Sequence, residues 1–186
     1  RKKLNLPKDK KIIIYTGHLY GWKGASVLAD SSKYLGGSFL VVFVGGTLND
    51  IKNFKKKYIE SKNILFTGYK EHKEIPIWQK SADVLVLPNT AKEKISKYYT
   101  SPMKLFEYMA SKRAIIASDI PSIRELVNDD MVYFVEPDNP LKLSNGIKDL
   151  VKNINLQNKL SQNAYNHVIN QTWDKRAKTI TEFINQ

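Results

Sequence analysis

The chain has 186 residues, 42% of them hydrophobic, which suffices for a folded domain and excludes a disordered or fibrous protein. It contains no cysteine, which excludes disulfides and thiolate metal sites and is typical of a cytoplasmic protein. The formal net charge of +12 favours anionic partners, among them phosphorylated ligands, an anionic membrane surface and nucleic acid.

Six short apolar runs predict β-strands, in chain order Ile12–Thr16, Phe39–Val44, Ile64–Thr67, Val84–Leu87, Ala114–Ser118 and Val132–Val135. Amphipathic stretches between them predict helices at Ala25–Tyr34, Asp50–Ser61, Lys73–Ser81, Pro102–Ser111 and Ser122–Val127, and the chain from Pro140 to Asn185 predicts two or three more. Strands that are apolar on both faces are typical of a parallel sheet covered by helices. The sequence therefore predicts an α/β domain over residues 1–186, with a doubly wound, Rossmann-like parallel sheet of about six strands.

The loop Gly17–Gly24 follows the first strand, on the sheet edge where doubly wound folds bind ligands. Its glycines, Gly17 and Gly21 among them, would let the backbone approach a ligand, and the following helix offers N–H groups to an anion. A lysine at a helix start gains nothing from the helix dipole, so Lys23 indicates a bound diphosphate. A plain tight turn is an equally weighted alternative.

Two further strand ends fall on the same edge. Gly45 and Gly46 follow the second strand and predict either an anion-binding nest or only a turn. Tyr69 follows the third strand and would either hold a flat base or lie exposed in a turn.

A fourth segment, Tyr98–Ala110, opens the helix that precedes the fifth strand. Ser101 is expected to cap this helix and Pro102 to occupy its first position. The helical spacing predicts that three side chains of this segment face the core, namely Met103, Phe106 and Ala110.

Lys104 and Glu107 are three residues apart and so share another face of that helix. One interpretation is a surface salt bridge of about 0–1 kcal/mol. The other is a carboxylate that accepts hydrogen bonds from a sugar diol while the helix start holds phosphate. The residues alone leave both open.

Metal and hydrolase sites are poorly supported. The three histidines, His18, His72 and His167, lack ligand spacing, so neither a metal nor another cofactor is expected. No Gly-x-Ser-x-Gly elbow provides a hydrolase nucleophile. The basic residues are dispersed and not interleaved with aromatic residues, so nucleic acid is not an expected partner.

In this order, the segments resemble the C-terminal, donor-binding domain of retaining GT-B glycosyltransferases of the "glycosyl transferases group 1" type. The stretches that carry the resemblance are Asp83–Asn89, Ser101–Ala110, Ala114–Asp119 and Pro121–Glu125. The resemblance implies that Lys23 holds the donor diphosphate, that backbone near Lys104 approaches it, and that Glu107 binds the ribose. The segment around Tyr69 would hold the base.

By this resemblance, Lys23 and Glu107 are the catalytic candidates. The implied substrate-binding set is Gly17, His18, Gly21, Lys23, Gly45, Gly46, Tyr69, Tyr99, Ser101, Pro102, Met103, Lys104 and Glu107. Tyr99 stands where the family has the first glutamate of its Glu-x-x-x-x-x-x-x-Glu motif, which leaves sugar recognition open. His18 stands where the family often has arginine, so charge compensation is expected to rest on Lys23.

The implied function is hexosyl or N-acetylhexosaminyl transfer from a nucleotide sugar, a UDP-sugar for preference, to a glycan or lipid-linked saccharide. Polysaccharide or lipopolysaccharide synthesis, in the cytoplasm or peripherally at the inner membrane face, is the expected setting. The family's N-terminal acceptor domain is absent from this chain, so the isolated domain is expected to be inactive or weakly active. Trp173–Ile184 resembles the helix that crosses back to that domain. The alternatives are a sugar-nucleotide epimerase of the same fold and a basic nucleic-acid-binding module.

Overall fold

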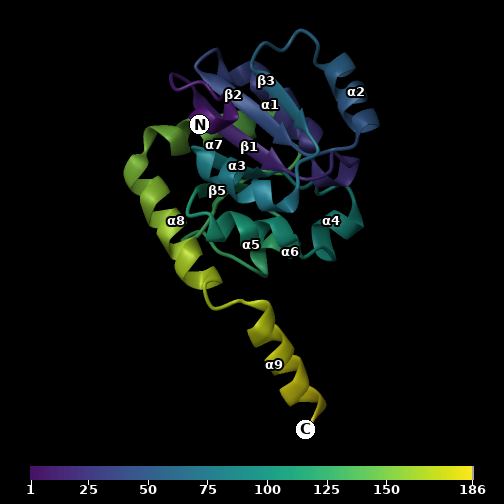
Figure 1. Ribbon diagram of the computed structural model, residues 1–186, viewed down its shortest axis with the longest axis vertical. Helices are drawn as coiled ribbons and strands as arrows, with labels where there is room; N and C mark the ends of the chain where they lie inside the picture. Colours follow the sequence, from purple (N-terminus) through teal and green to yellow (C-terminus); the bar gives the residue numbers. More distant parts are fainter. Residues whose placement is uncertain (186) are drawn as a thin grey trace.

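A six-stranded parallel sheet forms the centre of the computed structural model, which describes residues 1–185 (Figure 1). The strand order is β3-β2-β1-β4-β5-β6, so the order reverses between β1 and β4. The strands are β1 (Lys11–Thr16), β2 (Phe39–Val44), β3 (Ile64–Gly68), β4 (Val84–Leu87), β5 (Ala114–Ser118) and β6 (Tyr133–Val135). This is the doubly wound arrangement that the sequence predicted.

Helices cover both faces of the sheet. One face packs against helices α1 (Ala25–Leu35), α2 (Leu48–Lys57) and α7 (Pro140–Lys152). The other face packs against α3 (Ile75–Ser81), α5 (Met103–Ala110), α6 (Pro121–Arg124) and the end of α8 (Ile154–Val168). The remaining elements are α4 (Lys94–Tyr98), α9 (Trp173–Ile184) and the 3-10 turns η1 (Lys2–Leu4), η2 (Gly21–Lys23) and η3 (His72–Glu74).

The apolar strands are continuous in sequence because both faces of the sheet are buried. In β1, Ile12 and Ile14 join the core under α3 and α5, whereas Ile13 and Tyr15 join the core under α1 and α7. All four side chains have no exposed surface. β1 therefore contributes to two hydrophobic cores, which fixes the centre of the sheet between its helical layers.

Helix α4 lies in a stretch that the sequence left as a polar loop. It has no apolar periodicity, and polar contacts hold it instead. Ser96 is fully buried, its carbonyl accepts a hydrogen bond from Ser122 Oγ at 2.6 Å, and its hydroxyl accepts one from Asn89 Nδ2 at 3.4 Å. Tertiary hydrogen bonding thus specifies this helix where the hydrophobic pattern does not.

The expected orientation of α5 was wrong for Met103 and Ala110, whereas Phe106 is partly buried and packs against the core as predicted. Met103 is 54% exposed and Ala110 is also exposed, while the fully buried face consists of Leu105, Tyr108 and Met109. Two apolar stripes run along this short helix, and packing against the sheet selects the stripe that contains the large tyrosine. The helix begins at Met103 after Pro102, and Ser101 makes no capping hydrogen bond, contrary to expectation.

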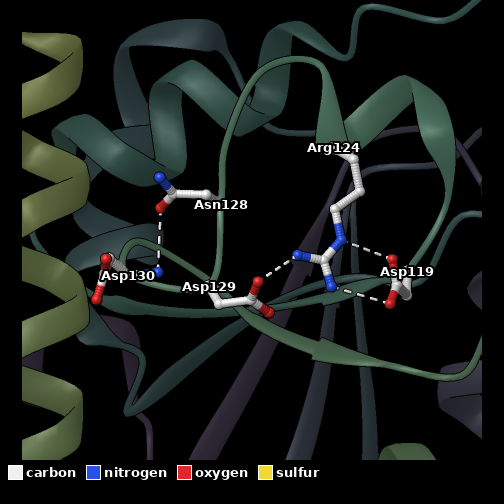
Figure 2. A network of polar contacts seen from close by, with 5 residues as sticks. All are labelled: Asp119, Arg124, Asn128, Asp129 and Asp130. Atoms are coloured by element: carbon white, nitrogen blue, oxygen red, sulfur yellow. Dashed lines mark hydrogen bonds and ion pairs between the residues drawn. The ribbon is translucent and has the colours of Figure 1, made fainter.

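A polar network fixes the chain after β5 (Figure 2). Arg124 Nε and an Arg124 Nη donate to the two carboxylate oxygens of Asp119 at 2.7 and 2.9 Å, and the other Nη lies 2.6 Å from Asp129. The guanidinium carbon lies 3.6 Å from the centroid of the Phe134 ring. The hydrogen bonds from Arg124 lower the pKa of Asp119. Bidentate pairing and stacking of this kind hold a loop in one geometry.

The C-terminal helix α9 extends away from the rest of the molecule (Figure 1). Every residue from 169 to 185 is exposed, including Trp173 at 67% and Phe183 at 77%. Among residues 1–185, the apolar side chains of α9 therefore belong to neither hydrophobic core. Within the described residues, no helix has the length and apolar character that crossing a membrane requires.

Candidate functional site

A cleft of about 690 Å³ lies at the carboxyl edge of the sheet, where strand order reverses. The ends of β1 and β2 and the loop after β4 form its floor, and the start of α5 forms one wall. The predicted site residues that line it are Gly17, His18, Lys23, Gly45, Gly46, Tyr69, Ser101, Pro102, Met103, Lys104 and Glu107. Gly21 lines a smaller neighbouring cavity instead, and Tyr99 is 78% exposed beside Tyr98.

Two glycines allow the loops of the floor to pack against one another. Gly24 has φ +68°, and a Cβ there would lie 1.8 Å from the carbonyl oxygen of Pro88. Gly45 has φ +116°, and a Cβ there would lie 2.6 Å from the carbonyl oxygen of Gly17. Both positions require glycine because of the backbone angle and the close approach.

Two buried tyrosines hold the first loop and α5 in place. The Tyr15 hydroxyl donates to the carbonyl of His18 at 2.6 Å. The Thr16 N–H donates to the Tyr108 hydroxyl at 2.9 Å, which ties α5 to the end of β1. Buried tyrosine hydroxyls normally find such partners. The loop and the helix start therefore form one rigid wall of the cleft.

Lys23 lies in η2 between two aromatic rings. Its Nζ is 5.2 Å from the ring centroid of Tyr20 and 5.1 Å from that of Trp22. Partial burial lowers the pKa of the Lys23 ammonium. The side chain is held beside the glycine turn, where an anion would restore the solvation that burial removes.

Lys104 also lines the cleft, but its ammonium is buried and lies 3.9 Å from the centroid of the Tyr15 ring. Sequence reasoning placed this side chain in a surface pair with Glu107 or left it to the backbone. Among residues 1–185, no ion pair joins the two side chains. The structure thus places a second lysine near Lys23 in the cleft.

Glu107 is oriented by residues that the sequence did not suggest. Its Oε2 accepts a hydrogen bond from Gln79 Nε2 at 3.0 Å, and its Oε1 lies 3.8 Å from His72 Nε2. Gln79 is only 3% exposed and comes from α3. The position of Gln79 directly after the apolar residues Ile75–Trp78 is the one sequence signal that could have indicated such a partner.

The cleft also has lining residues that were not among the predicted site residues, namely Thr16, Trp22, Val44, Thr47, Leu48, Lys70, His72, Ile75, Asn89 and Thr100. Of these, Asn89 is 2% exposed, and its Oδ1 has no hydrogen-bond partner. Buried polar atoms without partners are rare and often mark ligand contacts.

The arrangement suits a ligand that is anionic at one end and hydroxylated at the other. Lys23 and Lys104 lie beside the glycine turn, and the Glu107 carboxylate is one helical turn along α5 from Lys104. Lysines and helix-start N–H groups bind phosphate, and a carboxylate accepts hydrogen bonds from a diol. In the part of the chain described by the structure, no three His, Asp or Glu residues gather as metal ligands.

The chain is similar to known proteins both in sequence and in fold. A TuaC protein of Bacillus subtilis strain 168, a glycosyltransferase named for teichuronic acid biosynthesis, is 24% identical over 147 residues, which cover 79% of this chain and 34% of TuaC. Sucrose-phosphate synthase from Thermosynechococcus elongatus superimposes with a TM-score of 0.84 at 22% identity, over 100% of this chain and 47% of that one. Anabaena HepE in complex with UDP-glucose superimposes with a TM-score of 0.77 at 18% identity. The match covers 94% of this chain and 49% of HepE.

These lengths show that the chain spans about half or less of the proteins it resembles. The fold shared with the two structures is the GT-B half that the sequence predicted. The profile of the family described as "Glycosyl transferases group 1" matches residues 1–167. The chain belongs to the glycosyl transferases group 1 family.

Proposed function

We propose that this chain is the donor-binding half of a retaining glycosyltransferase whose donor is a UDP-sugar. The observation that carries the proposal is the cleft at the switch point of the sheet, which is lined by Lys23 and Lys104 and, one helical turn further along α5, by the Glu107 carboxylate. The UDP-glucose complex of the structurally similar HepE supports the choice of nucleotide.

The lysine end of the cleft would hold the diphosphate. Lys23 and the start of α5 converge there, and both attract phosphate oxygens. As the sugar leaves, negative charge grows on the diphosphate, and fixed cations stabilise that charge without rearranging. Lys23 therefore acts as an electrostatic catalyst, and the proposed chemistry needs no metal.

The part of the cleft next to Glu107 and Tyr69 would hold the nucleoside. Glu107 would accept hydrogen bonds from the ribose hydroxyls, since Gln79 and His72 leave its carboxylate partly exposed to the cleft. Tyr69, at the end of β3, is 77% exposed and lines the same cleft. It offers an aromatic surface and neighbouring backbone groups to the base.

Transfer to an acceptor would require a further domain. The similarity to TuaC and the exposed apolar side chains of α9 support a second domain that packs against α9 and binds a glycan or lipid-linked acceptor. Catalysis needs donor and acceptor held together, so the chain alone is expected to bind donor but transfer sugar slowly or not at all.

Calorimetric titration with UDP, GDP and ADP, in magnesium and in chelator, tests the proposal. We expect UDP to bind most tightly, with equal affinity in both conditions. Lys23→Ala should weaken binding at least about tenfold, because a hydrogen bond to a charged group contributes about 1.5–3 kcal/mol. The control, Lys33→Ala, removes a lysine that lies over Tyr34 outside the cleft and should change nothing. No binding of any nucleotide would contradict the proposal.

The ribose role of Glu107 has its own test. The parent chain should bind UDP at least about tenfold more tightly than 2′,3′-dideoxy-UDP. In Glu107→Ala the two ligands should bind equally, because the variant lacks the acceptor that distinguishes them. An unchanged preference in the variant would assign the ribose to another residue.

A further inference from the structure

The Lys104 ammonium is an unusual group because it is buried without a partner. Its Nζ has essentially no solvent-accessible surface and no hydrogen-bond partner among the described residues. The nearest aromatic group is the Tyr15 ring, whose centroid is 3.9 Å away. Lysine has three donor hydrogens, and leaving all of them unsatisfied in the interior is costly. The resting protein thus holds a group that an anion would stabilise.

The surroundings make the uncharged amine easier to form. Burial lowers the pKa of Lys104 well below its ordinary value, Lys23 lowers it further by repulsion, and Glu107 raises it by attraction. These groups come from η2 and from α5 itself, and the Tyr15 ring comes from β1. The only carboxylate in this set is bound to Gln79 and does not pair with the ammonium.

The missing partner would have to come from the cleft. Lys104 lines the cleft next to Gly17, and a Cβ built on Gly17 would lie 3.4 Å from Lys104 Nζ. Glycine at this position leaves no side chain between the ammonium and the turn that precedes Lys23. An anion placed against that turn is close enough to act on the ammonium through the low-dielectric interior, with or without direct contact.

We propose that Lys104 is a proton-linked sensor of the donor diphosphate, taking up a proton when the diphosphate binds and then serving as the second cation of the site. This inference rests on the proposed function, because it names Lys104 as part of the same donor site. The proton comes from solvent or buffer and joins the neutral amine, so the bound state gains one positive charge against the diphosphate.

Two consequences separate this arrangement from a site of permanently charged lysines. Nucleotide affinity should fall as pH rises, since more of the unbound chain must acquire a proton. Ligands should also differ: UDP should drive proton uptake, whereas uridine, which lacks phosphate, should not. A terminal phosphate titrates near pH 6, so the measurements belong above about pH 7.5.

Calorimetric titration of UDP in buffers with different ionisation enthalpies, at several values from about pH 7.5 to about pH 10, counts the protons taken up. The parent chain should take up a substantial fraction of about one proton per UDP somewhere in this range, and none with uridine. Lys104→Met should abolish the proton uptake and weaken UDP binding at least about tenfold. Lys33→Met, the control outside the cleft, should match the parent.

Lys23 is the other lysine that could titrate, and a second variant distinguishes the two. Lys23→Met should weaken UDP binding but keep the proton uptake. The uptake should move to higher pH, because Lys23 no longer repels the charged form of Lys104. Uptake that persists in a folded Lys104→Met chain would overturn the inference. UDP binding by the parent without any uptake would also overturn it while leaving the proposed function intact. Failure of the parent to bind UDP would overturn both.

Discussion

At the scale of single residues, Lys104 shows how a binding site can oppose folding. A group whose pKa is lower in the folded chain than in the unfolded chain reduces stability at every pH below its folded value. The loss disappears only as pH rises toward 10.5, the ordinary lysine value. Such opposition between stability and activity is common where a site holds a charge ready for a ligand.

Lys104→Met should therefore stabilise the unliganded chain while it weakens UDP binding. Methionine fills the same space without a charge, and a gain of roughly 1 kcal/mol would raise Tm by about 2–4 °C near pH 7. The gain should shrink as pH approaches 10.5. Thermal unfolding followed by circular dichroism measures both effects. A lower Tm at neutral pH would show that the ammonium already has a stabilising partner in the resting chain.

At the scale of elements, the turn from η2 into α1 depends on one glycine and not on its neighbour. At Gly24 a Cβ would collide with the Pro88 carbonyl, and φ is positive, whereas at Gly21 a Cβ meets nothing within 4 Å. The two residues lie three positions apart in the same loop. They are thus a matched pair for testing whether the backbone packing at the cleft floor matters.

Gly24→Ala should destabilise the fold by more than about 2 kcal/mol, because both the strained φ and the collision must be relieved. Gly21→Ala should change the free energy of unfolding by less than about 0.5 kcal/mol. Urea unfolding of the three proteins gives these values. Equal effects at the two positions would mean that the loop adapts and that the close approach to Pro88 is unimportant.

The elements also show what a single sequence can and cannot specify. The strands were predictable because strands buried on both faces of a parallel sheet consist of continuous apolar residues. The strands β2, β4 and β5 have the predicted bounds. Helix α4 was not predictable, because tertiary hydrogen bonds of Ser96 hold it and its sequence has no apolar periodicity. At the site, glycine turns and the α5 start were visible as motifs. The Gln79 contact to Glu107 and the burial of Lys104 depend on how α3 and β1 pack, which no local pattern records.

At the scale of the whole molecule, α9 behaves as an extension of the domain. All residues from 169 to 185 are exposed, and α9 has no buried side chain among the residues that the structure describes. Its stabilising partner, in our proposal, belongs to the acceptor-binding domain. The helix should therefore contribute little to the stability of the donor-binding half.

A chain that ends at Asn170 should keep Tm within about 2 °C of the parent value and bind UDP with the same affinity. The physical reason is that removing α9 exposes no core residue. Removing the apolar side chains of α9 should also reduce self-association at high concentration, measured by light scattering. A large loss of stability would indicate that α9 packs on this domain in solution.

The structure of this chain bound to UDP tests the central claim most directly. We predict that the diphosphate lies between the Gly17 turn and the start of α5, within hydrogen-bond reach of Lys23, and that the ribose hydroxyls donate to Glu107. A nucleotide bound elsewhere on the molecule, or in the cleft with the ribose at the lysine end, would contradict the account.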